Sequence, residues 1–251
     1  MAFPTTVRRA TAVSATSNST TWTPSWTWNT NTAIADGDRV LWILIISVDG
    51  AGDLSLTPDA WTFCGSSAQG SVNGVLLKQE TTTAFAASAM PTLGAITFTA
   101  SEQYSGVLLA FKVASGASVG VLELAFLDIT SANGSSTNSD PPSITNGSGA
   151  SRDVTVIATR SGDSTVVATV APTNYTDLQS RAGGGTNGAS TNTAERQINI
   201  ASAGTEDPGT FTSGTEQWVS FTFGVYEIAA AAPLAFPMHR PGDAFQHFLA
   251  R

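Results

Sequence analysis

The sequence predicts an all-β protein, a jelly-roll-like β-sandwich built from two tandem sequence repeats and followed by an extended C-terminal arm. Three features predict it: the composition, the alternation of apolar residues, and an internal repetition. Charged residues make up 12% of the 251 residues, about half of the roughly 25% usual in soluble domains. Ser, Thr, Asn and Gly replace them, and these residues suit strands and tight turns better than exposed helices.

Two kinds of apolar pattern predict the strands. In "VSFTFGV" (219–225) apolar and small polar residues alternate, which is typical of a strand with one buried face. "VLWILII" (40–46) is apolar throughout, as a strand covered on both faces requires. Its counterpart "VTVIATR" (154–160) carries Thr155 and Thr159, so we expect the first copy to be more completely buried than the second.

The repetition has a period of 114 residues. "TPDAWT" (57–62) matches "APTNYT" (171–176), and "SEQYSGVLLAFKV" (101–113) matches "TEQWVSFTFGVYEI" (215–228) at the same spacing. Small insertions and deletions lie between these anchors, since "LKQ" (77–79) precedes "ERQ" (195–197) by 118 residues. Several anchors at one spacing indicate a duplication, with repeat 1 over about 7–113 and repeat 2 over about 121–228.

Clusters of glycine and small polar residues separate the predicted strands, and we interpret them as turns and loops. Residues 121–129 are predicted to be a strand, so no flexible linker joins the two copies. A half-sheet on its own would expose an apolar face, which favours one sandwich over residues 1–232 rather than two domains in series. The main predicted loops are "CGSSAQGSVNG" (64–74), "SANGSSTNSDPPS" (131–143) and "RAGGGTNGAS" (181–190).

The C-terminal segment 233–251 departs from this pattern. Its three prolines, at 233, 237 and 241, favour an extended path, and Asp243 could cap a short helix. Either the segment is a disordered tail, or it is an arm that docks an aromatic face on another subunit or partner. We favour the arm, and its contact residues would be Phe236, Phe245, Phe248 and Leu249.

Charge and hydropathy exclude several classes of partner. The formal net charge is −8, and Lys78 and Lys112 are the only lysines. With no basic stripe, we expect no binding to nucleic acid or to an anionic membrane. The N-terminus lacks the apolar core of a signal peptide, and the longest apolar run is far too short to cross a bilayer. We therefore expect synthesis in the cytoplasm and no membrane insertion.

The residues that could form a catalytic or metal site predict neither an enzyme nor a cofactor. Both histidines, His239 and His247, lie in the C-terminal segment, so the rest of the chain cannot supply a Ser-His-Asp triad. Glu102 and Glu216 are the best carboxylate pair for a glycosidase, but their equivalent places in the two copies favour a shared structural role. "ADGD" (35–38) could hold Ca²⁺ through Asp36 and Asp38, but we interpret it as an exposed turn.

The repeated elements resemble a widespread kind of bacteriophage virion protein, the duplicated β-sandwich type. In that pattern a strand beginning with Gly-Asp precedes a Pro-x-x-Trp/Tyr-Thr turn and a closing strand that begins with an aromatic residue. The resemblance covers about residues 7–228. It implies a capsid decoration, head-fibre or tail-appendage protein that lies in the virion. Its partners would be other virion proteins, and we expect it to be a homo-oligomer. Its elements here are "DGDRVLWILIISVDG", "PDAWT" and "EQYSGVLLAF", then "SRDVTVIA", "PTNYT" and "EQWVSFTFGV".

"TTWTPSWTW" (20–28) holds three of the six tryptophans. In a single strand all three would point to one side. The matching stretch "SDPPSITNG" (139–147) places Trp26 on Ile144, so Trp26 is predicted to pack in the core. Trp22 and Trp28 fall on Asp140 and Asn146, which predicts an exposed contact surface for a sugar or a neighbouring subunit. The alternative function is therefore a carbohydrate-binding module for attachment to a host.

Overall fold

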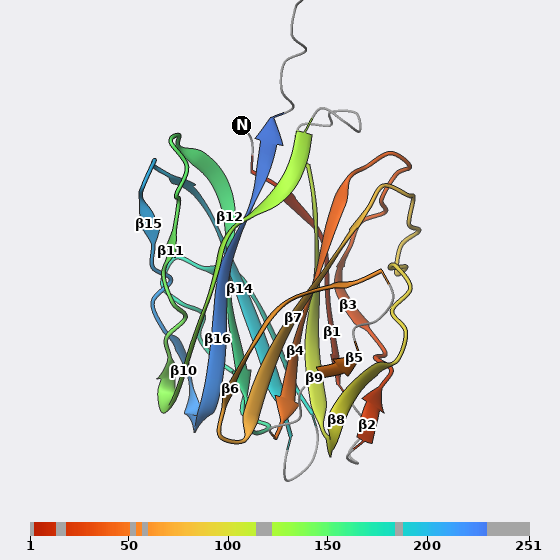
Figure 1. Ribbon diagram of the computed structural model, residues 1–251, viewed down its shortest axis with the longest axis vertical. Helices are drawn as coiled ribbons and strands as arrows, with labels where there is room; N and C mark the ends of the chain where they lie inside the picture. The colour runs from red at the N-terminus through yellow and green to blue at the C-terminus, as the bar shows by residue number, and fades with distance from the viewer. Residues whose placement is uncertain are drawn as a thin grey trace, which may run out of the picture.

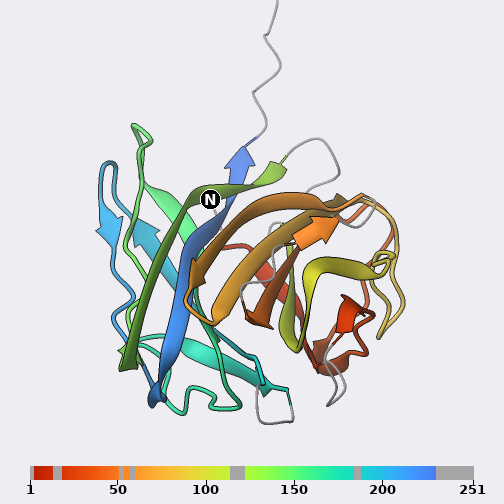
Figure 2. The same ribbon diagram turned by 60° about the horizontal axis from the view of Figure 1, so that its bottom comes forward.

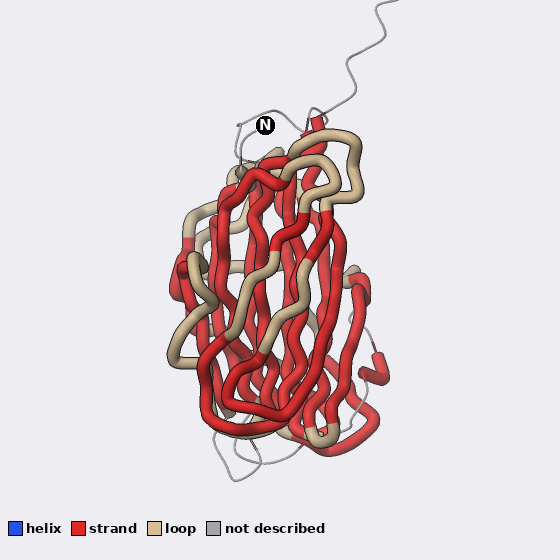
Figure 3. The backbone as a smooth tube through the Cα atoms, turned by 90° about the vertical axis from the view of Figure 1, so that its left-hand side faces the viewer, coloured by secondary structure: helices blue, strands red, loops and turns tan. Residues whose placement is uncertain are grey.

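The computed structural model describes residues 3–13, 19–50, 54–56, 60–113, 122–183 and 188–229, and within these ranges all of the regular structure is β-strand (Figure 3). The prediction of an all-β protein is confirmed. The strands are β1 (Thr5–Val13), β2 (Ser19–Trp22), β3 (Thr27–Asn31), β4 (Val40–Asp49), β5 (Leu54–Leu56), β6 (Thr62–Gln69), β7 (Val72–Thr81), β8 (Ile96–Glu102), β9 (Tyr104–Lys112), β10 (Leu122–Ser139), β11 (Ile144–Thr145), β12 (Arg152–Gly162), β13 (Thr176–Ala182), β14 (Ser190–Ile200), β15 (Thr205–Glu206) and β16 (Phe211–Ala229).

Two large antiparallel sheets form the body of the protein. The first large sheet has the order β3-β1-β9-β4-β7-β6, and the second has the order β10-β16-β12-β14-β13. The first half (residues 3–113) and the second half (residues 122–229) therefore each form one large sheet. Apart from β3, the five strands of each sheet follow one another in the same spatial order and the same chain order.

Four layers lie side by side in Figure 1. The two large sheets are the inner layers; β2, β8 and β5 cover the first sheet, and β11 and β15 cover the second. Successive side chains of a strand point to opposite faces, so each large sheet contributes to two cores. Trp42 and Leu44 face the β2–β8–β5 cover, Ile43 and Ile45 face the second large sheet, and Val156 faces the β11–β15 cover.

The central layer between the large sheets is apolar. Ile43 and Val107 from the first sheet meet Ile157 and Phe223 from the second. At one side of this layer β6 and β7 approach β10 and β16 (Figure 2), and at the other side β1 approaches β13. Burying one large aliphatic or aromatic side chain stabilises a fold by about 1.5–3 kcal/mol, so this layer joins the halves strongly.

The expectation that Thr155 and Thr159 make the second half less buried is wrong. Thr155 and Thr159 in β12 are as deeply buried as the apolar residues of β4, because their hydroxyls are bonded inside the protein. Thr155 Oγ1 donates to the Pro4 carbonyl at 3.2 Å, and Thr159 Oγ1 accepts from the Phe221 amide at 2.9 Å. The second half of the chain is thus not less buried than the first at this strand.

Two segments rich in small polar residues, predicted to be loops, contain strands instead. The predicted loop at 131–143 is largely the second part of β10, which runs on to Ser139 and pairs with β16. The predicted loop at 64–74 is a hairpin of β6 and β7. β6 and β10 are edge strands of their sheets, where small polar residues facing water are tolerated and the ladder hydrogen bonds determine the structure. The predicted C-terminal arm, 233–251, lies outside the described residues.

Candidate functional site

Trp22 lies in the core rather than on a contact surface. It is 3% exposed, and its ring stacks on Tyr104 with a centroid distance of 5.7 Å and an interplanar angle of 20°. Gly106 makes room for it, because a Cβ there would lie 2.8 Å from the indole ring. The Tyr104 hydroxyl donates to the carbonyl of Ser19, which lies in β2 together with Trp22, and this hydrogen bond fixes the stack. The predicted exposure of Trp22 is therefore wrong.

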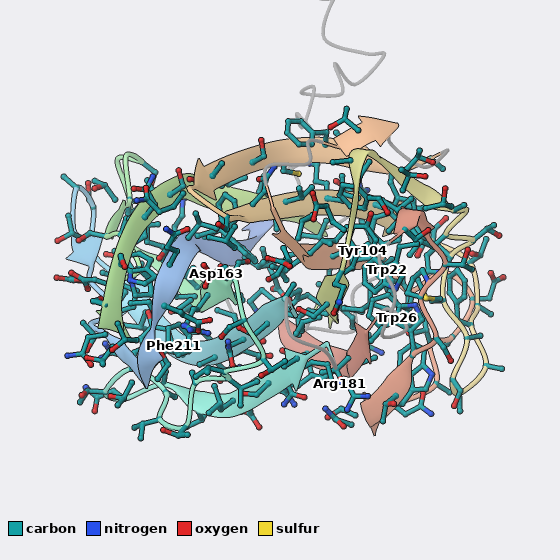
Figure 4. All side chains as sticks on the ribbon, turned by 90° about the horizontal axis from the view of Figure 1, so that it is seen from below. Trp22, Trp26, Tyr104, Asp163, Arg181 and Phe211 are labelled. Carbon is teal, nitrogen blue, oxygen red and sulfur yellow. The ribbon has the colours of Figure 1, made fainter. Side chains whose placement is uncertain are left out.

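The other two tryptophans of this stretch are half-buried. Trp26 packs against the same core, with its ring centroid 6.3 Å from that of Trp22, as predicted (Figure 4). Residues 23–26 interrupt the strand, so Trp22 is in β2 and Trp28 is in β3, opposite Ala10. The three tryptophans therefore do not share one strand, because the chain turns from the cover sheet into the large sheet at this point.

The comparison of Trp28 with Asn146 was misleading for a physical reason. Asn146 is fully buried, although its side chain is polar. Its amide nitrogen donates to the carbonyls of Ala150, Ile200 and Ala201 at 2.9–3.0 Å. A polar residue can lie in the interior when its hydrogen bonds are made there, so an Asn in one half does not indicate exposure in the other.

A polar cleft between the two large sheets is the best candidate for a site. Its volume is about 480 Å³, within the roughly 300–1,000 Å³ range of small-molecule sites. It opens where β1 of the first sheet lies against β13 and β14 of the second. The lining residues are Thr5, Thr6, Arg9, Asn174, Thr176, Asp177, Glu195, Arg196 and Gln197.

Arg9 and Glu195 are the fixed centre of this cleft. Arg9 Nε and Nη2 donate to the two carboxylate oxygens of Glu195 at 2.8 and 3.0 Å, and Thr6 Oγ1 donates at 2.8 Å. Arg9 Nη2 also lies 3.2 Å from Asp177 Oδ2, at a carboxylate that is half exposed. Burial alone would lower the pKa of Arg9, but the hydrogen bond and charge of Glu195, together with Asp177, raise it above its ordinary value.

The charges lining the cleft balance. Arg9 and Arg196 offset Asp177 and Glu195, and Arg196 Nη1 is held by Glu206 at 2.6 Å. The exposed amides of Asn174 and Gln197 lie among these groups. Such a lining suits a neutral ligand rich in hydroxyls better than an anion or a cation, because neither sign of charge dominates.

Sequence reasoning missed this cleft completely. Arg9 and Glu195 are separated by 186 residues, and neither belongs to a recognisable motif. They meet only because β1 and β14 lie at the same side of the two stacked sheets. A second cleft, also about 480 Å³, has a more apolar lining that includes Phe85, Met90 and Pro91.

Carboxylates also gather at one end of the central layer. Burial raises the pKa of Asp49 to about 6, and the charges of Glu102 and Asp163 add to this effect. Burial likewise raises the pKa of Glu102. Asp49 ends β4, and Asp163 directly follows β12, so the two large sheets bring these side chains together.

No group of His, Cys, Asp and Glu in the described ranges is arranged to hold a metal ion. Asp38 is occupied in the turn predicted for "ADGD": its Oδ2 accepts from Lys112 Nζ and from the Ala35 amide, both at 3.0 Å. Over the described parts of the chain, no helix is long and apolar enough to cross a membrane.

Glu102 and Glu216, which the sequence match sets at equivalent positions, have different partners in the structure. Glu216 is buried and forms an ion pair with Arg160, and it also accepts from Ser164 Oγ at 2.5 Å. The Glu102 carboxylate lies against Gly50, where a Cβ would collide with it. Neither carboxylate lines either of the two clefts.

Comparison of this chain with protein-family models, with curated proteins and with solved structures found no match.

Proposed function

We propose that this protein is a non-enzymatic structural protein on the exterior of a phage or phage-like particle, as a capsid decoration or a head or tail appendage. It assembles there through protein–protein contacts. The observation that carries the proposal is the apolar layer that joins the two large sheets into one body. A rigid β-body with most of its apolar surface turned inward suits a load-bearing component, and the sequence resemblance to virion proteins points the same way.

We further propose that the body is a duplicated jelly-roll-like unit. The contacts between the halves are reciprocal, as in a two-fold dimer. Thr191 of β14 bonds Ser105 and Ser47 across the central layer at 2.6 and 2.7 Å. Gly74 of β7 approaches Val219 and Ser161, which lie 114 residues after that serine pair.

The backbone shows the same correspondence. The Asp49 amide donates to the Gln103 carbonyl at 3.0 Å, and the Asp163 amide donates to the Gln217 carbonyl at 3.3 Å. Ala60 and Asn174, also 114 apart, have left-handed φ values of 67° and 68°. A shared strained conformation at equivalent turns supports a common origin of the two halves.

Incorporation into particles tests the assembly role. Particles made with a chain that ends at residue 232 are expected to lack the protein, while the shortened chain stays folded and soluble. A chain with Phe245→Ser and Phe248→Ser keeps the length of the segment and tests its aromatic side chains. Gradient-purified particles are assayed by quantitative mass spectrometry. Full incorporation of both variants overturns the role of the arm, and absence of the unaltered protein from particles overturns the function.

The polar cleft favours a second candidate function, binding of a host-surface glycan. Amides, hydroxyls and balanced ion pairs are the groups that hydrogen-bond sugar hydroxyls, and the cleft holds all three kinds. We therefore propose that the sugar contacts Asn174, Asp177 and Gln197 rather than Trp22. Isothermal titration with host polysaccharide should give binding that Asn174→Ala weakens at least tenfold, whereas Asp207→Ala, outside the cleft, has no effect. Absence of heat with the unaltered protein refutes this candidate.

A further inference from the structure

The second large sheet lacks a strand that the first one has. In the first sheet, β3 pairs with the outer edge of β1, with Thr27 opposite Thr11. Thr11 also lies opposite Val107 in β9, and its counterpart in the second half, Ser131 of β10, lies opposite Phe221 in β16. Within the described residues, β16 is the one strand with which β10 pairs. The outer edge of β10 is therefore open where β1 is covered.

The chain itself explains the difference. Seventeen residues separate Trp22 at the end of β2 from Val40 at the start of β4, and this length accommodates β3. The corresponding connection from Ser139 to Arg152 has twelve residues. Asn146 holds this connection against the β11–β15 cover, because its backbone amide donates to the Gly204 carbonyl at 2.9 Å. No residues remain in this connection for a sixth strand.

Between the irregularities at its two ends, the open edge carries neither a charge nor a proline that would protect it. Native edge strands carry lysines, prolines or inward-pointing charges that prevent pairing with another chain. From Ile129 to Ser139 the edge strand β10 has neither a charged residue nor a proline. Its ladder with β16 is regular from Ile129 to Ser136, between irregularities on either side. Eight regular residues exceed the usual strand length of about 5–6.

We propose that this edge, residues 130–136 of β10, pairs with the same edge of a second copy of this chain in antiparallel fashion. A two-fold axis places each residue against the same segment of its partner, so a charged strand would bring like charges together. The uncharged sequence "TSANGSS" avoids that conflict. The opposite edge strand of this sheet, β13, carries Asp177 and Arg181 and lacks this self-complementarity.

Pairing would join two five-stranded sheets into one continuous ten-stranded sheet and leave the polar cleft, which lies at the β13 side, open to solvent. The inference rests on the proposed role as an assembly component, since it names the first contact that such a component would make. It can nevertheless fail separately, because it is measured on the purified protein without particles.

Sedimentation equilibrium of the full chain at 0.15 M salt, where repulsion between two bodies of net charge −8 is largely screened, should show a dimer. Ser131→Lys with Asn133→Lys places exposed charges on the edge and should raise the dimer dissociation constant at least tenfold. The control is Thr99→Lys with Ser101→Lys, which adds the same charge to exposed positions of β8. Circular dichroism and thermal unfolding establish that both variants are folded.

Single cysteines at Ser131, Asn133 and Ser135, each in a Cys64→Ser background, provide a second measurement. Oxidation should cross-link two copies through at least one of these positions, and a cysteine at Ser101 should not cross-link. A chain that is monomeric at all concentrations overturns the proposal, as does a dimer that both lysine variants leave intact. A dimer sensitive only to the β10 variant supports it, even where the protein is absent from particles.

Discussion

Removing one member of the buried Arg160–Glu216 ion pair should destabilise the protein strongly. Both side chains are almost inaccessible to solvent, at 0% and 3% exposure. Burial lowers the pKa of Arg160 to about 10, with the charge of Asp163 opposing this shift, so Arg160 remains a cation at neutral pH. Glu216→Leu therefore leaves a buried charge without its counterion.

The expected cost can be worked out from these surroundings. Breaking a buried ion pair by removing one partner costs about 3–5 kcal/mol, because the remaining charge stays desolvated. In Glu216→Leu, the remaining Arg160 contacts would be Ser190 Oγ at 3.2 Å and the Val166 carbonyl at 3.3 Å, and neither carries a negative charge. For a chain of this size, 3–5 kcal/mol corresponds to a decrease of roughly 10–15 °C in the melting temperature.

The double variant Arg160→Met/Glu216→Leu is the matched control. Replacing a buried pair by apolar side chains of similar volume is often neutral or stabilising. Under the proposed duplication, the first half has an apolar residue, Ile46, at the position of Arg160. Urea unfolding of the two single variants and the double variant gives the coupling energy. Additive costs, with a coupling below about 0.5 kcal/mol, would refute the argument that the pair acts as a unit.

Three further results are expected. Trp22→Ala should lower the free energy of unfolding by about 3–5 kcal/mol, because it empties a fully packed aromatic site. Trp28 is only half-buried, so Trp28→Ala should lower this free energy by less than half as much. Urea unfolding measures both values. Asn146→Ala should cost about 2–4 kcal/mol, because it leaves buried carbonyls without donors; a cost below 1 kcal/mol would contradict its structural role. Because the pKa of Asp49 is raised to about 6 in the folded state, its protonation stabilises the fold at low pH, and this stabilisation is lost as the pH rises from about 4 through 6. Asp163→Asn should lower the pKa of Asp49 in an NMR titration. The same substitution should flatten the dependence of the unfolding free energy on pH in this range.

The sequence predicted the fold class because strand formation here depends on local patterns. The fully apolar run at 40–46 is buried on both faces in β4, as its composition indicated. Residues 122–129 of the predicted strand form the first part of β10. Patterns of this kind can be recognised in a short stretch of sequence, because the buried faces of a sheet require apolar residues at those positions.

Register was less predictable, because a shift of one residue moves a side chain to the other face of the sheet. The sequence match at 77–79 and 195–197 equates Leu77 with Glu195. In the structure Leu44 lies opposite Leu77 and Ala158 lies opposite Ala194. Under the proposed duplication, which equates Leu44 with Ala158, Leu77 corresponds to Ala194 instead. Leu77 and Ala194 both face a cover, whereas Glu195 faces the polar cleft. Composition alone could not detect the shift.

The candidate site could not be predicted from the sequence for a related reason. Its residues come from β1, β13 and β14, and nothing in their local sequence marks them as partners. Trp22, by contrast, looked conspicuous in the sequence and proved to be core. A tryptophan cluster indicates packing as readily as binding, and only the position of Tyr104 and Gly106 decides between them.

Under the proposed duplication, positions at which the two halves differ show where each acquired its own role. At one side of the central layer, Arg9 meets Glu195 and forms a charged opening. At the other side, half-buried Ile129 and Cys64 extend the apolar layer between β10 and β6 and close it. On this second side, where apolar contacts close the central layer, lies the uncharged edge of β10 that no described strand covers. Assembly and ligand binding would thus occupy opposite sides of one body, and each could be removed by substitution without disturbing the other.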